Sequence, residues 1–255
     1  RALGIEFRLH VENAIWRDFF DGMFSLASLL LVVLFGAALG NVMRGVPLGA
    51  DHYFFLPLWT NFRPGPEPGV LDWYTVLCGV VVLVALGTHG AHYLAMRVSG
   101  ALNERARRIA RLGTLALPAL TLVSLVATRA VRPGVLDNFR RYPAGLLIPV
   151  AVAASLAVMY RAVRRGRERT AFAASVAYLA TMLVGAAFAL YPVLLPASGD
   201  PARSLTVTMA ATGGHAMRVA LIWWPIAFVL VAASFTHLYR TFRGKLSAAD
   251  SDGYH

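Results

Sequence analysis

The sequence is poor in charged residues and has almost no cysteine. Only 15% of its 255 residues are Asp, Glu, Lys or Arg, whereas 58% are hydrophobic, and the mean hydropathy is +0.60. An average soluble domain carries about 25% charged residues. The single cysteine, Cys78, lies in an apolar stretch and has no partner for an intramolecular disulfide. Redox chemistry at cysteine therefore has little support, and the composition favours a membrane protein.

Acidic residues are scarce as well: 13 Asp and Glu stand against 24 Lys and Arg, which gives a net charge of +11. A strong positive charge can indicate a nucleic-acid partner. Here the basic residues form short clusters between apolar runs, and no recognition motif accompanies them. We therefore expect no nucleic-acid partner and interpret the clusters as loops that set the orientation in a membrane.

Long apolar runs are what the sequence has in abundance. Between Met23 and Leu39 no side chain is charged, and with its flanks this run approaches the roughly 20 residues that a helix needs to cross a bilayer. Within it, Gly36 and Gly40 share one helix face, which indicates either a seam where another helix packs closely or only the general frequency of glycine in membrane helices. The sequence thus predicts an all-α polytopic membrane domain over residues 1–255. The predicted spans are 20–42, 71–96, 109–127, 143–161, 171–195 and 217–240, and residues 43–70 are predicted to form an outer loop.

The distribution of Lys and Arg predicts the orientation of these spans. The flanks at residues 1–19, 97–111, 161–169 and 240–255 hold 16 of the 24 basic residues. Because cytoplasmic loops retain positive charge, both ends are expected on the cytoplasmic side of the membrane. The chain begins with Arg1 rather than Met, and no signal peptide precedes its first span. We therefore expect it to be the middle of a longer polypeptide.

Several short segments together resemble a known family. In order along the chain these are RALGIEFR, a Trp-Arg pair followed by Asp21, GNVMRGVPL, THGAHYLAMR, YPVLLP and YRTFRGK. This series is similar to subunit II of the cytochrome bd-type quinol oxidases. The resemblance implies eight transmembrane helices, so that six are present and the two N-terminal ones are absent.

The resemblance also implies a function. This chain would be the non-haem, non-catalytic half of a heterodimer in the bacterial cytoplasmic (inner) membrane. The partner, subunit I, would carry haems b and d and the quinol site, and the complex would draw on the quinone pool and reduce dioxygen to water. No cofactor is expected in this chain, with a structural quinone as the alternative, and contacts with membrane lipid are expected.

The candidate supporting residues are Arg1, Glu6, Asp21, Asn41 and His89. Arg1, Glu6 and Asp21 are ionisable groups at a predicted membrane boundary, where such groups tend to be paired or functional. In the family, residues that match Arg1 and Asp21 are associated with the integrity of the haem region of the other subunit. The alternative for Asp21 is an acid near a helix N-terminus that interacts with the helix dipole.

His89 and His92 are three residues apart, and a metal pair is conceivable. Because no acidic or cysteine partner accompanies them, we expect no metal site. His89 is interpreted as a buried hydrogen-bonding residue between helices, and His92 as an interfacial residue. Two other functions remain open from the residues alone: a secondary transporter or channel-like protein, and a haem-binding membrane anchor. The apolar helix centres and the lack of a convincing repeat speak against a transporter.

Overall fold

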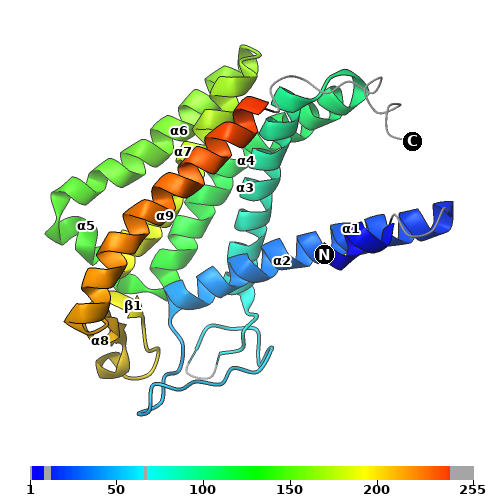
Figure 1. The fold of residues 1–255 in the computed structure, drawn as a ribbon. Helices are drawn as coiled ribbons and strands as arrows, with labels where there is room; N and C mark the ends of the chain where they lie inside the picture. Colours follow the sequence, from blue (N-terminus) through cyan, green and yellow to red (C-terminus); the bar gives the residue numbers. More distant parts are fainter. Residues whose placement is uncertain (1, 9–12, 66–67, 242–255) are drawn as a thin grey trace.

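The structure is a computed structural model, and it describes residues 2–8, 13–65 and 68–241 (Figure 1). Most of these residues are helical. The long helices are α2 (Ala14–Arg44), α3 (Trp73–Arg97), α4 (Gly100–Val131), α6 (Leu147–Arg164), α7 (Glu168–Leu190) and α9 (Gly214–Thr241). The short elements are α1 (Ala2–Arg8), η1 (Pro133–Leu136), α5 (Asp137–Arg141), η2 (Pro143–Leu146), β1 (Val193–Leu195), η3 (Pro201–Arg203), β2 (Leu205–Thr206) and α8 (Val207–Ala210).

Six helices in the described residues are long and apolar enough to cross a membrane. Five of them are α2, α3, α4, α7 and α9, and the sixth is α6 together with the turn η2 that precedes it. The predicted fold class, an all-α polytopic membrane protein, is confirmed. Within a bilayer such helices satisfy all their backbone hydrogen bonds internally, which explains why the apolar runs adopt this form.

The helices pack mainly as sequential neighbours, with α3 at the centre. Helix α3 contacts α2, α4 and α7, and α6 pairs with α7 (Figure 1). Helix α2 is buried only toward its C-terminal end, and its N-terminal part extends away from the other helices with α1 beside it. Helix α9 has no buried residue. The protein therefore combines a packed centre with two long helices that leave much apolar surface exposed.

Several helix boundaries differ from the predicted spans: α2 begins at Ala14 and not at residue 20, and two further differences have a clear local cause. Helix α4 begins at Gly100, so the basic stretch up to Arg111 is helical and is not a loop. Ala, Leu, Arg and Glu dominate this stretch, and all are strong helix formers. Helix α7 ends at Leu190, and Val193–Leu195 pairs as an antiparallel strand with Leu205–Thr206. Pro192 explains this end, because proline donates no backbone hydrogen bond and disfavours helix at the residue before it.

The glycines of α2 pack as predicted against α3. A Cβ atom at Gly36 would lie 2.7 Å from Cα of Gly79 and 2.9 Å from the carbonyl oxygen of Cys78. At Gly40 a Cβ atom would lie 3.1 Å from the side chain of Cys78. The two backbones approach this closely because glycine has no side chain, which is the basis of small-residue seams in membranes. Cys78 is thus a packing residue, as its apolar surroundings predicted.

Candidate functional site

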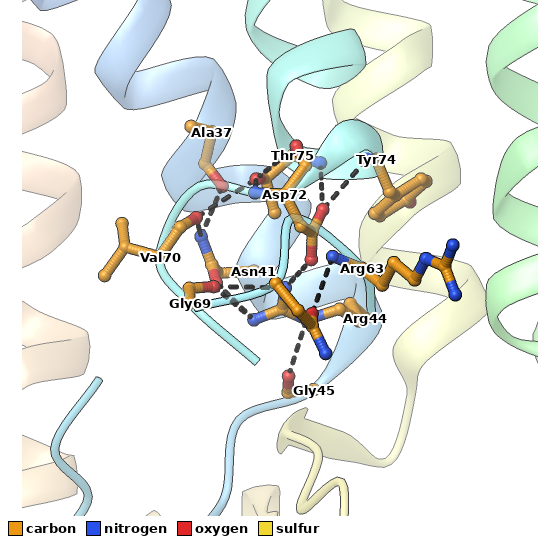
Figure 2. A network of polar contacts seen from close by, with 11 residues as sticks. Ala37, Asn41, Arg44, Gly45, Arg63, Gly69, Val70, Asp72, Tyr74 and Thr75 are labelled. Carbon is orange, nitrogen blue, oxygen red and sulfur yellow. Dashed lines mark hydrogen bonds and ion pairs between the residues drawn. The ribbon is translucent and has the colours of Figure 1, made fainter. Parts of the chain in front are cut away.

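A buried ion pair joins the end of α2 to the start of α3. The guanidinium of Arg44 donates to the carboxylate of Asp72, and the side chains of the two residues are 4% and 0% exposed. Figure 2 shows the two groups facing each other between the helix ends. Burying two charges is costly, and the cost is repaid only where the geometry is good and the remaining polar atoms are bonded.

Asp72 has a second role as the N-cap of α3. Its carboxylate accepts hydrogen bonds from the backbone N–H groups of Tyr74 and Thr75, both at 2.8 Å. In return, the hydroxyl of Thr75 accepts a bond from the backbone N–H of Asp72 at 2.9 Å. This reciprocal arrangement is a capping box, which satisfies donors that the first turn of a helix leaves free. These contacts give Asp72 a structural role at the start of α3.

Asn41 ties the loop before Asp72 to the same site. Its side-chain amide donates to the carbonyl oxygens of Ala37 and Val70, at 2.9 Å each, and its oxygen accepts from Arg44 at 2.6 Å. Arg44 also donates to the carbonyl oxygen of Gly69 at 3.3 Å. The polar atoms of this cluster bond to one another and to the loop backbone (Figure 2). The cluster therefore holds the end of the 45–72 loop against the bundle.

The opposite end of α2 carries a second, exposed ion pair. Arg8 of α1 lies 2.7 Å from the carboxylate of Asp21, and the two side chains are 43% and 54% exposed. The indole N–H of Trp16 donates to the carbonyl oxygen of Phe7 at 2.7 Å and fastens α1 to α2. Glu6 is exposed on α1. Arg1 lies outside the described residues, so its role stays a prediction.

The helix-dipole interpretation of Asp21 is wrong. Helix α2 begins at Ala14, with Asn13 as its cap, and Asp21 lies two turns further along. The dipole acts mainly within the first turn, so it contributes little at Asp21. The partner of Asp21 in the described chain is the guanidinium of Arg8.

The two histidines of α3 bond to different helices. Nδ1 of His89 lies 2.8 Å from the hydroxyl of Ser175 on α7, and its ring stacks on Phe172 at 4.9 Å. Nε2 of His92 lies 3.2 Å from the hydroxyl of Thr114 on α4. His89 is half-buried and makes the predicted interhelical contact. The prediction of an interfacial His92 is wrong, because its side chain is 3% exposed and lies between helices.

Residues that could hold a metal do not gather in the part of the chain that the structure describes: no group of three or more His, Cys, Asp and Glu side chains is found there.

Sequence reasoning missed Arg44, the central residue of the buried cluster. The available signal was an arginine at the end of one apolar run and an aspartate at the start of the next, since ionisable groups at that depth are usually paired.

The six spans, the glycine seam and the bonded polar clusters define a polytopic helical membrane protein held together by its own buried contacts. Comparison with known proteins then places it in a family. The chain belongs to the cytochrome bd terminal oxidase subunit II family, whose model matches residues 1–242. The resemblance inferred from the short motifs is confirmed.

Three relatives illustrate the match. The probable cytochrome oxidase subunit 2 of Haemophilus influenzae is 29% identical over 281 residues, covering 97% of this chain and 71% of the relative. The cytochrome bd-I ubiquinol oxidase subunit 2 of Escherichia coli K12 is 27% identical, covering 92% and 68%. The cytochrome bd ubiquinol oxidase subunit 2 of Bacillus subtilis is also 27% identical, covering 97% and 70%. These matches favour an oxidase subunit over the transporter alternative.

Proposed function

We propose that this chain is the non-haem subunit of a bd-type quinol oxidase, a complex that oxidises quinol and reduces dioxygen to water. The observation that carries the proposal is the match of the family model to residues 1–242. The relatives' names, which describe ubiquinol oxidase subunits, support quinol as the electron donor. In this proposal the chain supports a haem-bearing partner, subunit I, and carries no catalytic site of its own.

We propose that haems b and d are bound by subunit I, which the family match supports. The two α3 histidines have interhelical contacts: Nδ1 of His89 lies beside Ser175 of α7, and Nε2 of His92 lies beside Thr114 of α4. We interpret both as residues that position helices. A structural quinone in this chain stays a prediction.

The exposed part of α2 is the surface that we propose subunit I covers. It is apolar along most of its length, with Leu26, Leu30 and Leu34 among its exposed side chains, and it also carries Asp21. An ionisable group at the membrane boundary tends to be paired or functional. In the described chain Asp21 is paired with the half-exposed Arg8, so a second protein subunit on this face would complete its surroundings.

The orientation follows from the charges. We propose that the ends of α3 and α6 that carry Arg97 and Arg164 face the cytoplasm of a bacterial cell, and that the 45–72 loop faces the outer side. The arginines at the adjoining ends of α3 and α4, and those between and at the adjoining ends of α6 and α7, support this, because the positive-inside rule counts basic residues close to the ends of the spans.

Co-purification tests the function. The full-length protein is tagged in its native membrane, the complex is purified, and its spectrum is recorded with and without dithionite. We expect a second, haem-bearing subunit in stoichiometric amount, bd-type haem bands and quinol-dependent oxygen uptake. Two results together would overturn the proposal. The tagged protein purifies alone, and membranes of a strain that lacks its gene still assemble a spectrally intact bd oxidase.

A further inference from the structure

A basic groove lies along the end of α6, away from the buried cluster and from α2. Two hollows that share Tyr160 and Arg164 form it: one of about 500 Å³ is lined by α6 and the residue that follows it, and one of about 350 Å³ lies between α6 and α4. The first hollow is completed by Ala157, Arg161 and Arg165. The second is completed by residues of α4 and one more of α6: Arg111, Thr114, Leu115 and Val163.

Four arginines therefore line the groove: Arg161, Arg164 and Arg165 line the first hollow, and Arg111 and Arg164 line the second. None of them forms an ion pair with an acid in the part of the chain that the structure describes. The nearby acid at the start of α7, Glu168, is bound by Arg107 at 2.6 Å. The groove thus has a concentrated positive charge that the described chain does not neutralise.

The orientation of Arg164 is partly set by its neighbour Tyr160. The guanidinium lies 3.4 Å from the phenol oxygen and 5.8 Å from the centre of the ring. Arginine stacked on an aromatic ring keeps its remaining N–H groups available in a planar fork, which suits the oxygens of a phosphate. Tyr160 is also the kind of amphipathic side chain that lies at the level of lipid headgroups.

The side of the groove that runs toward the bilayer centre is apolar. Leu115 and Ala157 line it, and Leu112 and Leu122 of α4 and Val150 of α6 continue as exposed apolar side chains along the same two helices. A soluble anion would gain nothing from these side chains. A lipid would, because its acyl chains would lie along them while its phosphate met the arginines.

We propose that this groove binds the phosphate-bearing headgroup of an anionic phospholipid, with Arg111 and Arg164 as its principal contacts. The charge of the groove complements such a headgroup, and basic pockets between transmembrane helices on the cytoplasmic side are suited to it. The site is independent of the proposed contact with subunit I, because it lies on α4 and α6 and not on α2.

The test uses the assembled, delipidated complex in detergent. It is titrated with cardiolipin, with zwitterionic phosphatidylcholine and with inorganic phosphate, and bound lipid is counted by native mass spectrometry. We expect cardiolipin to bind in preference to phosphatidylcholine, and the pair Arg111→Gln with Arg164→Gln to weaken cardiolipin binding roughly tenfold or more. Inorganic phosphate that displaces cardiolipin at comparable concentration would assign the groove to a soluble anion and overturn the proposal.

A matched pair of variants separates the groove from general surface charge. Arg105→Gln with Arg169→Gln removes the same charge from exposed arginines at the same end of the bundle, but neither residue lines the hollows. We expect this pair to bind cardiolipin within about twofold of the wild type. Two results would show that the groove is not a lipid site. One is an equal loss of cardiolipin binding in the two pairs of variants. The other is no loss of cardiolipin binding in the groove pair, while both complexes stay assembled and spectrally intact.

Discussion

Helix α2 carries an ion pair at each end, and the two pairs are made of the same chemical groups in opposite surroundings. Arg44 and Asp72 are almost completely buried, and they donate further hydrogen bonds to the side-chain oxygens of Asn41 and Thr75. Arg8 and Asp21 are about half exposed. The glycines of the helix divide in the same way, since Gly36 packs tightly on α3 whereas Gly22 has no atom within 4 Å of its Cβ position.

This difference separates contacts that hold the subunit together from groups that are available to a second protein. The polar side chains at the C-terminal end of α2, Asn41 and Arg44, find their partners inside their own chain. Further toward the N-terminus, α2 presents Asp21 and exposed leucines to its surroundings, and Arg8 of α1 lies beside the carboxylate. In a membrane, a purely apolar face can rest against lipid, but a face that also carries charge is expected to meet protein. The two halves should therefore respond to substitution in different ways.

The largest effect is expected from Asp72→Asn. Asparagine keeps an oxygen that can cap Tyr74 and Thr75, but it removes the charge opposite Arg44. An uncompensated buried charge costs about 3–5 kcal/mol of folding free energy. We expect a large fall in the temperature at which the detergent-solubilised complex loses this subunit, measured by size-exclusion chromatography after heating.

The double variant Arg44→Leu with Asp72→Asn is the control for that measurement. It removes both charges, and exchanging a buried pair for apolar or neutral groups is often close to neutral. We expect it to regain most of the stability that Asp72→Asn loses. A single variant as stable as the wild type would show that the buried pair does not hold the loop and helix ends together.

An intermediate effect is expected from Gly36→Ala. The new methyl group would lie 2.7 Å from the backbone of Gly79, so α2 and α3 must move apart. Overpacking of this kind costs about 1–3 kcal/mol. Gly22→Ala adds the same methyl group where nothing lies within 4 Å, and alanine favours a helix by up to about 1 kcal/mol. Thermal stability should fall for Gly36→Ala and stay level or rise for Gly22→Ala; a similar change in both would contradict the packing seam.

Much of this comparison could be predicted from the sequence, and the rest depended on contacts between distant residues. The length of the apolar runs predicted six spans, and the spacing of Gly36 and Gly40 predicted the seam, because both follow from local helix geometry. The partnership of Arg44 with Asp72 was missed, since the two residues are 28 positions apart and a loop lies between them. His92 was misjudged because its burial depends on where α4 packs.

The predicted helix boundaries were wrong for a related reason. Hydropathy marks where a helix can lie in lipid, but it does not mark where the helix ends. Helix α4 therefore continues into the basic stretch before residue 109, and α7 ends at Leu190 although the apolar sequence runs on to Leu195. In the first case helix propensity extends the helix, and in the second Pro192 stops it.

The smallest effect on stability, and the most informative effect on function, is expected from Asp21→Asn. An exposed ion pair contributes about 0–1 kcal/mol and is screened by salt, so the subunit should remain folded and inserted. If subunit I covers this face, loss of the carboxylate should weaken the haem bands and oxygen uptake of the assembled complex. Asp18→Asn is the matched control, because it neutralises an exposed acid one turn away that forms no ion pair in the described residues. If the haem spectra change equally in both variants, or in neither, Asp21 is an ordinary surface charge and the contact with subunit I lies on another face.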